Sequence, residues 1–132
     1  MSVGTWNPSE QVTELSAPVL DELLVAATRP ADEDFGLAPA DIERLAGSAH
    51  ANRVDWQTAS EALHDDQVIA LIRFYTLAEG RFPAWKAGSN SPVIVLAKAL
   101  RARGAWHNEL TTWIKGHTEN RFLPYGSLID RL

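Results

Sequence analysis

The stretch best suited to binding chemistry is FPAWKAGSNSP, residues 82–92, which brings small polar side chains to the start of an expected helix. Unpaired backbone N–H groups and the positive end of the helix dipole can hold an anion at such a position. Lys86 adds positive charge within the loop, and we expect basic and polar groups from the flanking sequence to join it. The candidate ligand-binding residues are Arg81, Lys86, Ser89, Asn90, Ser91, Arg121 and Tyr125.

The same loop also has a purely structural interpretation, which stays open at this point. Every helix start has unpaired N–H groups, and few of them bind phosphate. Ser91 would then serve only as the helix N-cap, and Trp85 would only cover the core. An anionic or phosphate-bearing ligand at residues 81–91 is therefore one hypothesis beside a loop that is merely packed in place.

The sequence contains little that would support a metal site or thiol chemistry. The chain has no cysteine, which excludes disulfides, zinc–thiolate sites and a thiol nucleophile. Glu61 and His64 have the i, i+3 spacing of a carboxylate-bridged metal site, but such a site needs a second copy and further carboxylates. We expect a solvated helix end there, and neither a metal ion nor a cofactor. His117 continues an apolar stripe, which favours a hydrogen-bonded core histidine.

No catalytic residue is indicated. Asp32, Glu33 and Asp34 are adjacent in one loop, and general acid–base catalysis needs a carboxylate whose pKa is shifted by burial or by a neighbour. Three neighbouring acids in a loop favour a solvated turn instead. The sequence contains no G-x-S-x-G elbow, no phosphate-binding P-loop and no G-x-G-x-x-G motif. Only a site assembled from distant residues remains open for an enzyme.

Charge is distributed unevenly along the chain. Residues 1–66 hold 13 acidic and 3 basic side chains, whereas residues 67–132 hold 4 acidic and 9 basic ones. Either the two halves pack together and neutralise each other, or the basic residues gather into a face that receives an acidic partner. Basic residues interleaved with aromatic ones can also bind single-stranded nucleic acid. The sequence pI near 5.3 argues against that reading.

Helical periodicity runs through nearly every segment, and no segment alternates for long enough to predict a strand. Helices are expected to start at Asn7, Pro39, Asp55, Asp65 or Asp66, and Ser91. The first of them should either kink or be followed by a new helix at Ser16. A last apolar stripe of helical spacing runs from Trp106 to His117. The helix after Asp65 is apolar on most faces, so the others should surround it, and it should end at Gly80.

The C-terminal part of the chain is expected to be less regular. The helix after Ser91 should end at Gly104. Residues 120–125 should be extended, because Pro124 disfavours the helical region at Leu123. The tail at residues 122–132, with a last helical turn capped by Ser127, carries enough apolar side chains to form a strap docked onto the helices.

These patterns predict an all-α protein, a single compact orthogonal bundle of about six helices over residues 1–132 with a C-terminal strap. The composition is that of a soluble globular protein, and neither a secretory signal nor a membrane-spanning stretch is seen. We therefore expect a cytoplasmic location and no membrane partner. Nine Arg against three Lys, with abundant alanine, hints at a GC-rich bacterial genome.

Three functional hypotheses follow from the sequence. The leading one is a non-enzymatic protein-interaction module that binds a protein partner or associates with itself as a dimer. The alternative is a protein that binds, or an enzyme that acts on, a small anionic or phosphate-bearing ligand at the 81–91 loop. The third is nucleic-acid binding through the basic C-terminal half.

Overall fold

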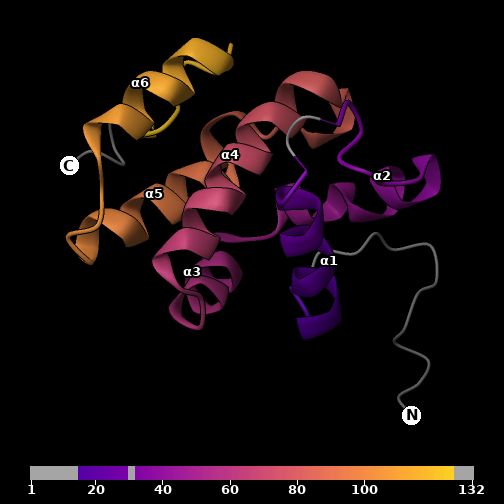
Figure 1. The fold of residues 1–132 in the computed structure, drawn as a ribbon, viewed down its shortest axis with the longest axis horizontal. Helices are drawn as coiled ribbons and strands as arrows, with labels where there is room; N and C mark the ends of the chain where they lie inside the picture. Colours follow the sequence, from indigo (N-terminus) through magenta and orange to yellow (C-terminus); the bar gives the residue numbers. More distant parts are fainter. Residues whose placement is uncertain (1–14, 30–31, 127–132) are drawn as a thin grey trace.

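The computed structural model describes residues 15–29 and 32–126, and every regular element within them is helical (Figure 1). The α-helices are α1 (Ala17–Ala27), α2 (Pro39–Leu45), α3 (Arg53–Glu61), α4 (Asp65–Arg81), α5 (Pro92–Ala102) and α6 (Asn108–His117). Short 3₁₀-helices lie between them: η2 (Ala46–His50), η3 (Pro83–Trp85) and η4 (Gly88–Asn90). The prediction of an all-α fold with about six helices is confirmed. The helix expected from Asn7 and residues 127–132 of the expected strap lie outside the described residues.

Helix α4 runs through the middle of the molecule and packs against α1, α5 and α6 (Figure 1). Its side chains Val68, Leu71 and Ile72 are fully buried, as the apolar pattern predicts. A helix that is apolar on most faces must be covered on most faces, and the surrounding helices supply that cover. In the described part of the chain, no helix is both long and apolar enough to cross a membrane.

Both ends of α4 differ from their predicted positions. The N-cap is His64, whose backbone N–H donates to Gln67 Oε1 at 2.9 Å. Asp65 and Asp66 therefore occupy the first helical turn, where their charge still favours the helix dipole. At the other end the helix continues through Gly80 to Arg81. It stops at Phe82 because the residue before a proline is pushed out of the helical region.

An aromatic cluster joins α4 to its neighbours. The ring centroids of Phe74 and Trp85 are 5.5 Å apart, and those of Trp56 and Tyr75 are 5.3 Å apart, both in edge-to-face geometry. Their polar atoms are paired as well. The Tyr75 hydroxyl lies 2.7 Å from Ser48 Oγ, and the indole N–H groups of Trp56 and Trp85 donate to backbone carbonyls. Trp85 is thus a core residue.

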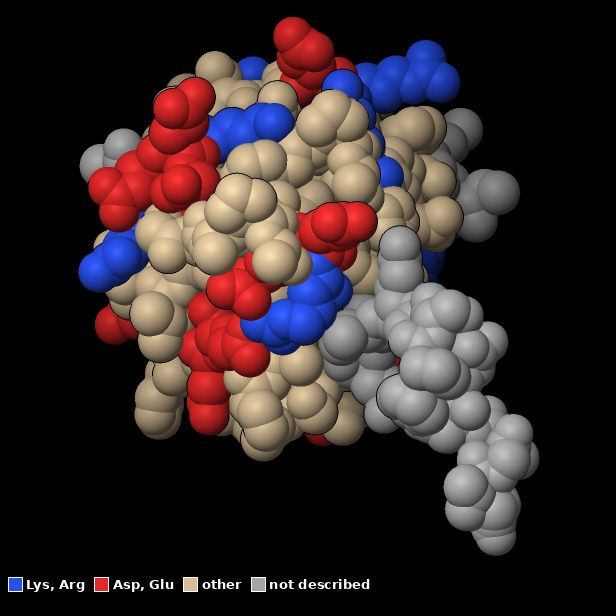
Figure 2. Space-filling view, turned by 90° about the vertical axis from the view of Figure 1, so that its right-hand side faces the viewer, with Lys and Arg blue, Asp and Glu red and all other residues tan. Residues whose placement is uncertain are grey.

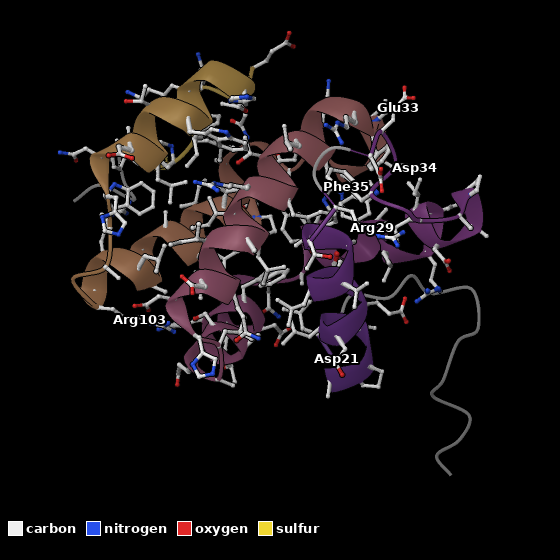
Figure 3. All side chains as sticks on the ribbon, in the orientation of Figure 1. Asp21, Arg29, Glu33, Asp34, Phe35 and Arg103 are labelled. Atoms are coloured by element: carbon white, nitrogen blue, oxygen red, sulfur yellow. The ribbon has the colours of Figure 1, made fainter. Side chains whose placement is uncertain are left out.

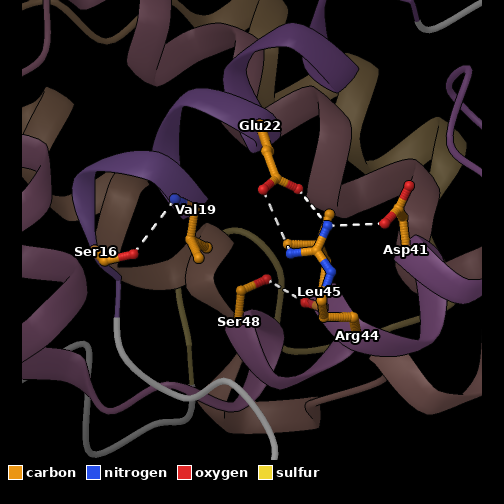
Figure 4. A network of polar contacts seen from close by, with 7 residues as sticks. All are labelled: Ser16, Val19, Glu22, Asp41, Arg44, Leu45 and Ser48. Atoms are coloured by element: carbon orange, nitrogen blue, oxygen red, sulfur yellow. Dashed lines mark hydrogen bonds and ion pairs between the residues drawn. The ribbon is translucent and has the colours of Figure 1, made fainter.

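Polar contacts at the surface fix α1 against α2 (Figure 4). Ser16 caps α1, as predicted, by accepting the backbone N–H of Val19 at 3.4 Å. Arg44 of α2 forms ion pairs with Glu22 of α1 at 2.5 Å and with Asp41 at 2.8 Å. Exposed pairs of this kind contribute about 0–1 kcal/mol, so they orient the two helices more than they stabilise them.

Acidic and basic side chains lie side by side on the face that carries α1 and α2 (Figure 2). The Arg44 pairs join charges within the acidic N-terminal half of the sequence. Arg103 of α5 joins the two halves, because its Nη1 donates to Asp65 Oδ1 at 3.1 Å. Local pairing of this kind neutralises part of the charge asymmetry of the chain.

Four further local predictions can be compared with the structure. The cap of α5 is Ser91, as predicted, and Gly104 follows that helix with a φ of +72°. The cap of α3 is Asn52 rather than Asp55, because the Asn52 side chain accepts the Asp55 N–H at 2.8 Å. His117 is exposed rather than in the core, with its ring stacked on Trp113 at a centroid distance of 4.2 Å.

The segment after α6 is also not extended as predicted. Residues 121–125 form turns that contain a cis Leu123–Pro124 peptide bond. The Asn120 side chain accepts the backbone N–H of Phe122 at 3.0 Å, and the Asn120 carbonyl accepts that of Leu123 at 3.1 Å. These local hydrogen bonds satisfy the backbone in a turn, so the preference imposed by Pro124 does not produce a straight connector.

Replacing Trp85 tests the aromatic core. We expect Trp85→Ala to lower the free energy of unfolding by about 3–5 kcal/mol, because a fully buried indole leaves a cavity that the surrounding rings cannot fill. Urea unfolding measures the change. Val25→Ala is the matched control, since Val25 is 64% exposed. Equal stability of the two variants would contradict a core role for Trp85.

Candidate functional site

The 81–91 loop is organised around a carboxylate that comes from α4. Glu79 is only 4% exposed. Its Oε2 accepts a hydrogen bond from Ser91 Oγ at 2.5 Å, and its Oε1 accepts from the Ala87 N–H at 3.4 Å and from Asn120 Nδ2 at 3.3 Å. Burial raises the pKa of Glu79 above its ordinary value, and the three donors partly oppose that shift.

Glu79 therefore occupies the position at which the sequence predicts an external anion. The Ser91 hydroxyl bonds Glu79 and also accepts the Val93 N–H at 3.2 Å as the cap of α5. Asn120 bonds Glu79 and the Gly88 carbonyl, the latter at 3.0 Å, and so fastens the loop to the segment after α6. These side chains already have partners within the chain, which leaves less donor capacity for a ligand.

The structure brings some of the predicted ligand-binding residues together and separates others. Lys86 and Arg121 line a cavity of about 350 Å³ beside Glu79. Lys86 and Asn90 line a neighbouring hollow. Arg81 lies elsewhere, because its Nη1 donates to the Asp32 carbonyl at 2.9 Å.

Arg81 makes a separate set of contacts at the end of α4. Its guanidinium stacks over Phe35 at 4.6 Å from the ring centroid. Figure 3 shows Phe35 beside Arg29 and Asp34 in this part of the molecule. The acidic loop residues Asp32, Glu33 and Asp34 are themselves exposed.

The remaining predicted residues, Ser89 and Tyr125, are each connected with a groove that the sequence does not predict. The Ser89 carbonyl accepts a hydrogen bond from Arg53 at 3.4 Å, and both Arg53 and Tyr125 line this groove between α3 and α5. We call it the α3–α5 groove. Its volume is about 400 Å³, and its lining residues are Arg53, Gln57, Ser60, Glu61, Ile94, Val95, Lys98, Ala99, Arg101, Ala102, Arg103 and Tyr125.

Arg101 is the unusual residue of the groove. Its guanidinium carbon lies 5.1 Å from the ring centroid of Tyr125 and 5.6 Å from that of Trp106. Its Nη1 is buried and has no hydrogen-bond partner among residues 15–29 and 32–126. Burial lowers the pKa of Arg101 from its ordinary value, while the Tyr125 side chain opposes the shift. A buried donor without a partner is costly, and it would gain from an acceptor supplied by a ligand.

The other basic residues of the groove have different roles. Arg103 Nη1 donates to the Leu63 carbonyl at 3.0 Å, and its Nη2 donates to the Ser60 carbonyl. Figure 3 shows Arg103 at the end of α5 near α3, so it holds the two walls together. Lys98 is exposed at the rim. The sequence places these basic residues at the end of one helix, but the opposite wall, α3, follows only from the tertiary structure.

The residues considered for metal binding do not form a site. Among the residues that the structure describes, no group of three His, Asp or Glu side chains could hold a metal ion. Glu61 is the last residue of α3 and His64 is the N-cap of α4, so the two do not share a helix face as their spacing suggests. His50 Nε2 lies 2.8 Å from the Ala84 carbonyl and supports η3.

Replacing Glu79 tests the buried carboxylate. Because its pKa is higher in the folded protein than in the unfolded chain, stability is greatest below the unfolded pKa and falls as the pH rises through the folded value. In Glu79→Gln we expect this decline to disappear. Urea unfolding from about pH 4 to about pH 8 measures it. Glu119→Gln, an exposed change at the same cavity, is the control, and an unaltered pH dependence in Glu79→Gln would contradict the assignment.

Comparison of the chain with protein-family models, with curated proteins and with solved structures finds no match. The fold, the buried Glu79 and the α3–α5 groove are therefore the observations on which a function can be built.

Proposed function

We propose that this chain is a non-enzymatic interaction module that binds an acidic segment of a partner protein in the α3–α5 groove. The observation that carries the proposal is Arg101, whose buried Nη1 has no partner in the described part of the chain. A carboxylate from the partner would supply that acceptor. Hydrogen bonds between a guanidinium and a carboxylate are charge-assisted and are stronger than neutral ones.

The chemistry of the groove favours a segment that is both acidic and apolar. Ile94, Val95 and Ala99 give it apolar walls, and Lys98 adds positive charge at its rim. Glu61 is the only acidic residue among the described residues that line it. An apolar side chain of the partner would cover the aliphatic surface, while neighbouring acidic side chains would meet the basic groups.

A small oxyanion at the same groove is the second candidate, since the unpartnered nitrogen of Arg101 fits a phosphate as well as a carboxylate. Such a ligand would leave the apolar walls uncovered, so the peptide is favoured. Nucleic acid fits less well, because a single strand needs aromatic platforms on which its bases can stack. The rings of Tyr125 and Trp106 instead lie beside the Arg101 guanidinium.

Replacing Arg101 tests the proposal. The probe is a fluorescent acetyl-Glu-Leu-Glu-Leu-amide peptide, and fluorescence anisotropy measures its Kd. We expect Arg101→Met to weaken binding by at least about tenfold, because a hydrogen bond to a charged group contributes roughly 1.5–3 kcal/mol. Methionine keeps an unbranched side chain beside the two rings, so circular dichroism should show an unchanged helical spectrum.

Arg73→Met is the matched control. Arg73 also lies over a tryptophan, with its guanidinium carbon 5.6 Å from the Trp113 ring centroid, but it does not line the groove. Equal peptide affinity in the two variants would contradict the proposal. Tight binding of inorganic phosphate or of an oligothymidylate, without binding of the peptide, would replace it with one of the other two candidates.

A further inference from the structure

The basic surface of the α3–α5 groove continues beyond it. Arg53 lines the groove and also the next hollow, which His50, Asn52, Lys86 and Asn90 help to form. Lys86 in turn lines this hollow and the cavity beside Glu79. Two basic side chains therefore connect three neighbouring depressions. We call the path from Arg101 through Arg53 to Lys86 the basic track.

Hydrogen bonds hold the parts of the track in place. Arg53, the first residue of α3, donates from Nη2 to the Ser89 carbonyl in η4 at 3.4 Å. The His50 ring nitrogen Nε2 lies 2.8 Å from the Ala84 carbonyl in η3. The loop that carries Lys86 is thus fixed at two points, to the end of η2 through His50 and to the start of α3 through Arg53. Lys86 is a defined part of the surface, although its side chain is exposed.

The acidic residues that line the three depressions show where the basic track begins and ends. Among the described residues, the middle hollow has no acidic lining residue, whereas the groove has Glu61 and the last cavity has Glu79 and Glu119. Arg121 faces this last cavity together with Glu119, so the charge there is mixed. Basic side chains therefore line the path from Arg101 through Arg53 to Lys86, and Glu79 and Glu119 join them in the last cavity.

We propose that the acidic segment bound in the α3–α5 groove continues past Arg53 and places a further acidic residue against Lys86. This inference rests on the proposed function and specifies how far the partner segment extends along the surface. The segment is an extended acidic peptide, longer than the groove alone can hold. Each additional residue of an extended chain advances by about 3.3 Å, so a few residues carry a carboxylate beyond the groove.

Peptides of different length test the track. The short probe is acetyl-Glu-Leu-Glu-Leu-amide. Long probes carry a Glu-Ser-Glu-Ser extension at either end, since the direction of the chain is open, and control probes carry Gly-Ser-Gly-Ser instead. We expect one of the acidic extensions to tighten binding by about three- to tenfold, a gain typical of one or two exposed charge pairs. The Gly-Ser extensions should give no gain.

Variants of the protein locate that gain. Lys86→Glu should abolish the benefit of the extension and leave the affinity for the short peptide unchanged. Arg73→Glu is the control for a charge reversal away from the track. The gain should also shrink as salt rises, because exposed charges are screened.

The outcomes separate the inference from the proposed function. If the short peptide binds through Arg101 but neither extension improves its affinity, the track is wrong and the groove stands. A gain that survives in Lys86→Glu overturns the route to Lys86. If a long peptide binds through Lys86 while Arg101→Met has no effect, the proposed groove function fails, and the continuous track from Arg101 fails with it, which leaves only a binding surface around Lys86.

Discussion

Helix α4 needs cover on nearly every side, and this requirement organises the rest of the molecule. Its apolar residues are spread around the helix, so no single neighbour can shield them from water. Helices α1, α5 and α6 pack directly on it, and Trp85 of η3 closes a further side. Burial of each large apolar side chain contributes about 1.5–3 kcal/mol, which far exceeds what the surface ion pairs of Arg44 supply.

The sequence predicted the helices well because the signals that define them are local. Ser16 and Ser91 stand directly before helices that contain an early proline, and the apolar stripe of α4 is visible without any tertiary information. Predictions failed where an asparagine side chain accepts a nearby backbone N–H in a way that the sequence pattern does not reveal. Asn52 rather than Asp55 caps α3, and Asn120 bends the segment that Pro124 was expected to extend.

The candidate site was harder to foresee because it forms between distant parts of the chain. The basic residues at the end of α5 are visible in the sequence, but nothing local indicates that α3 lies opposite them. Arg101 and Arg103 show the limit most clearly. They are two residues apart on one helix end, yet Arg103 bonds the carbonyls of Ser60 and Leu63 while Arg101 keeps an unpartnered nitrogen.

The hydrogen bonds around Glu79 constrain how this sequence can change over evolutionary time. Glu79, Ser91 and Asn120 come from three separate segments, and the buried Glu79 accepts hydrogen bonds from both of the others. Losing one leaves polar atoms unpaired, and the backbone groups of Ala87, Val93 and Gly88 would lose their partners even if all three side chains became apolar together. Changes at residues that share such a network are not additive, so each change depends on the other two residues. Related chains should therefore keep the three residues together or lose them together.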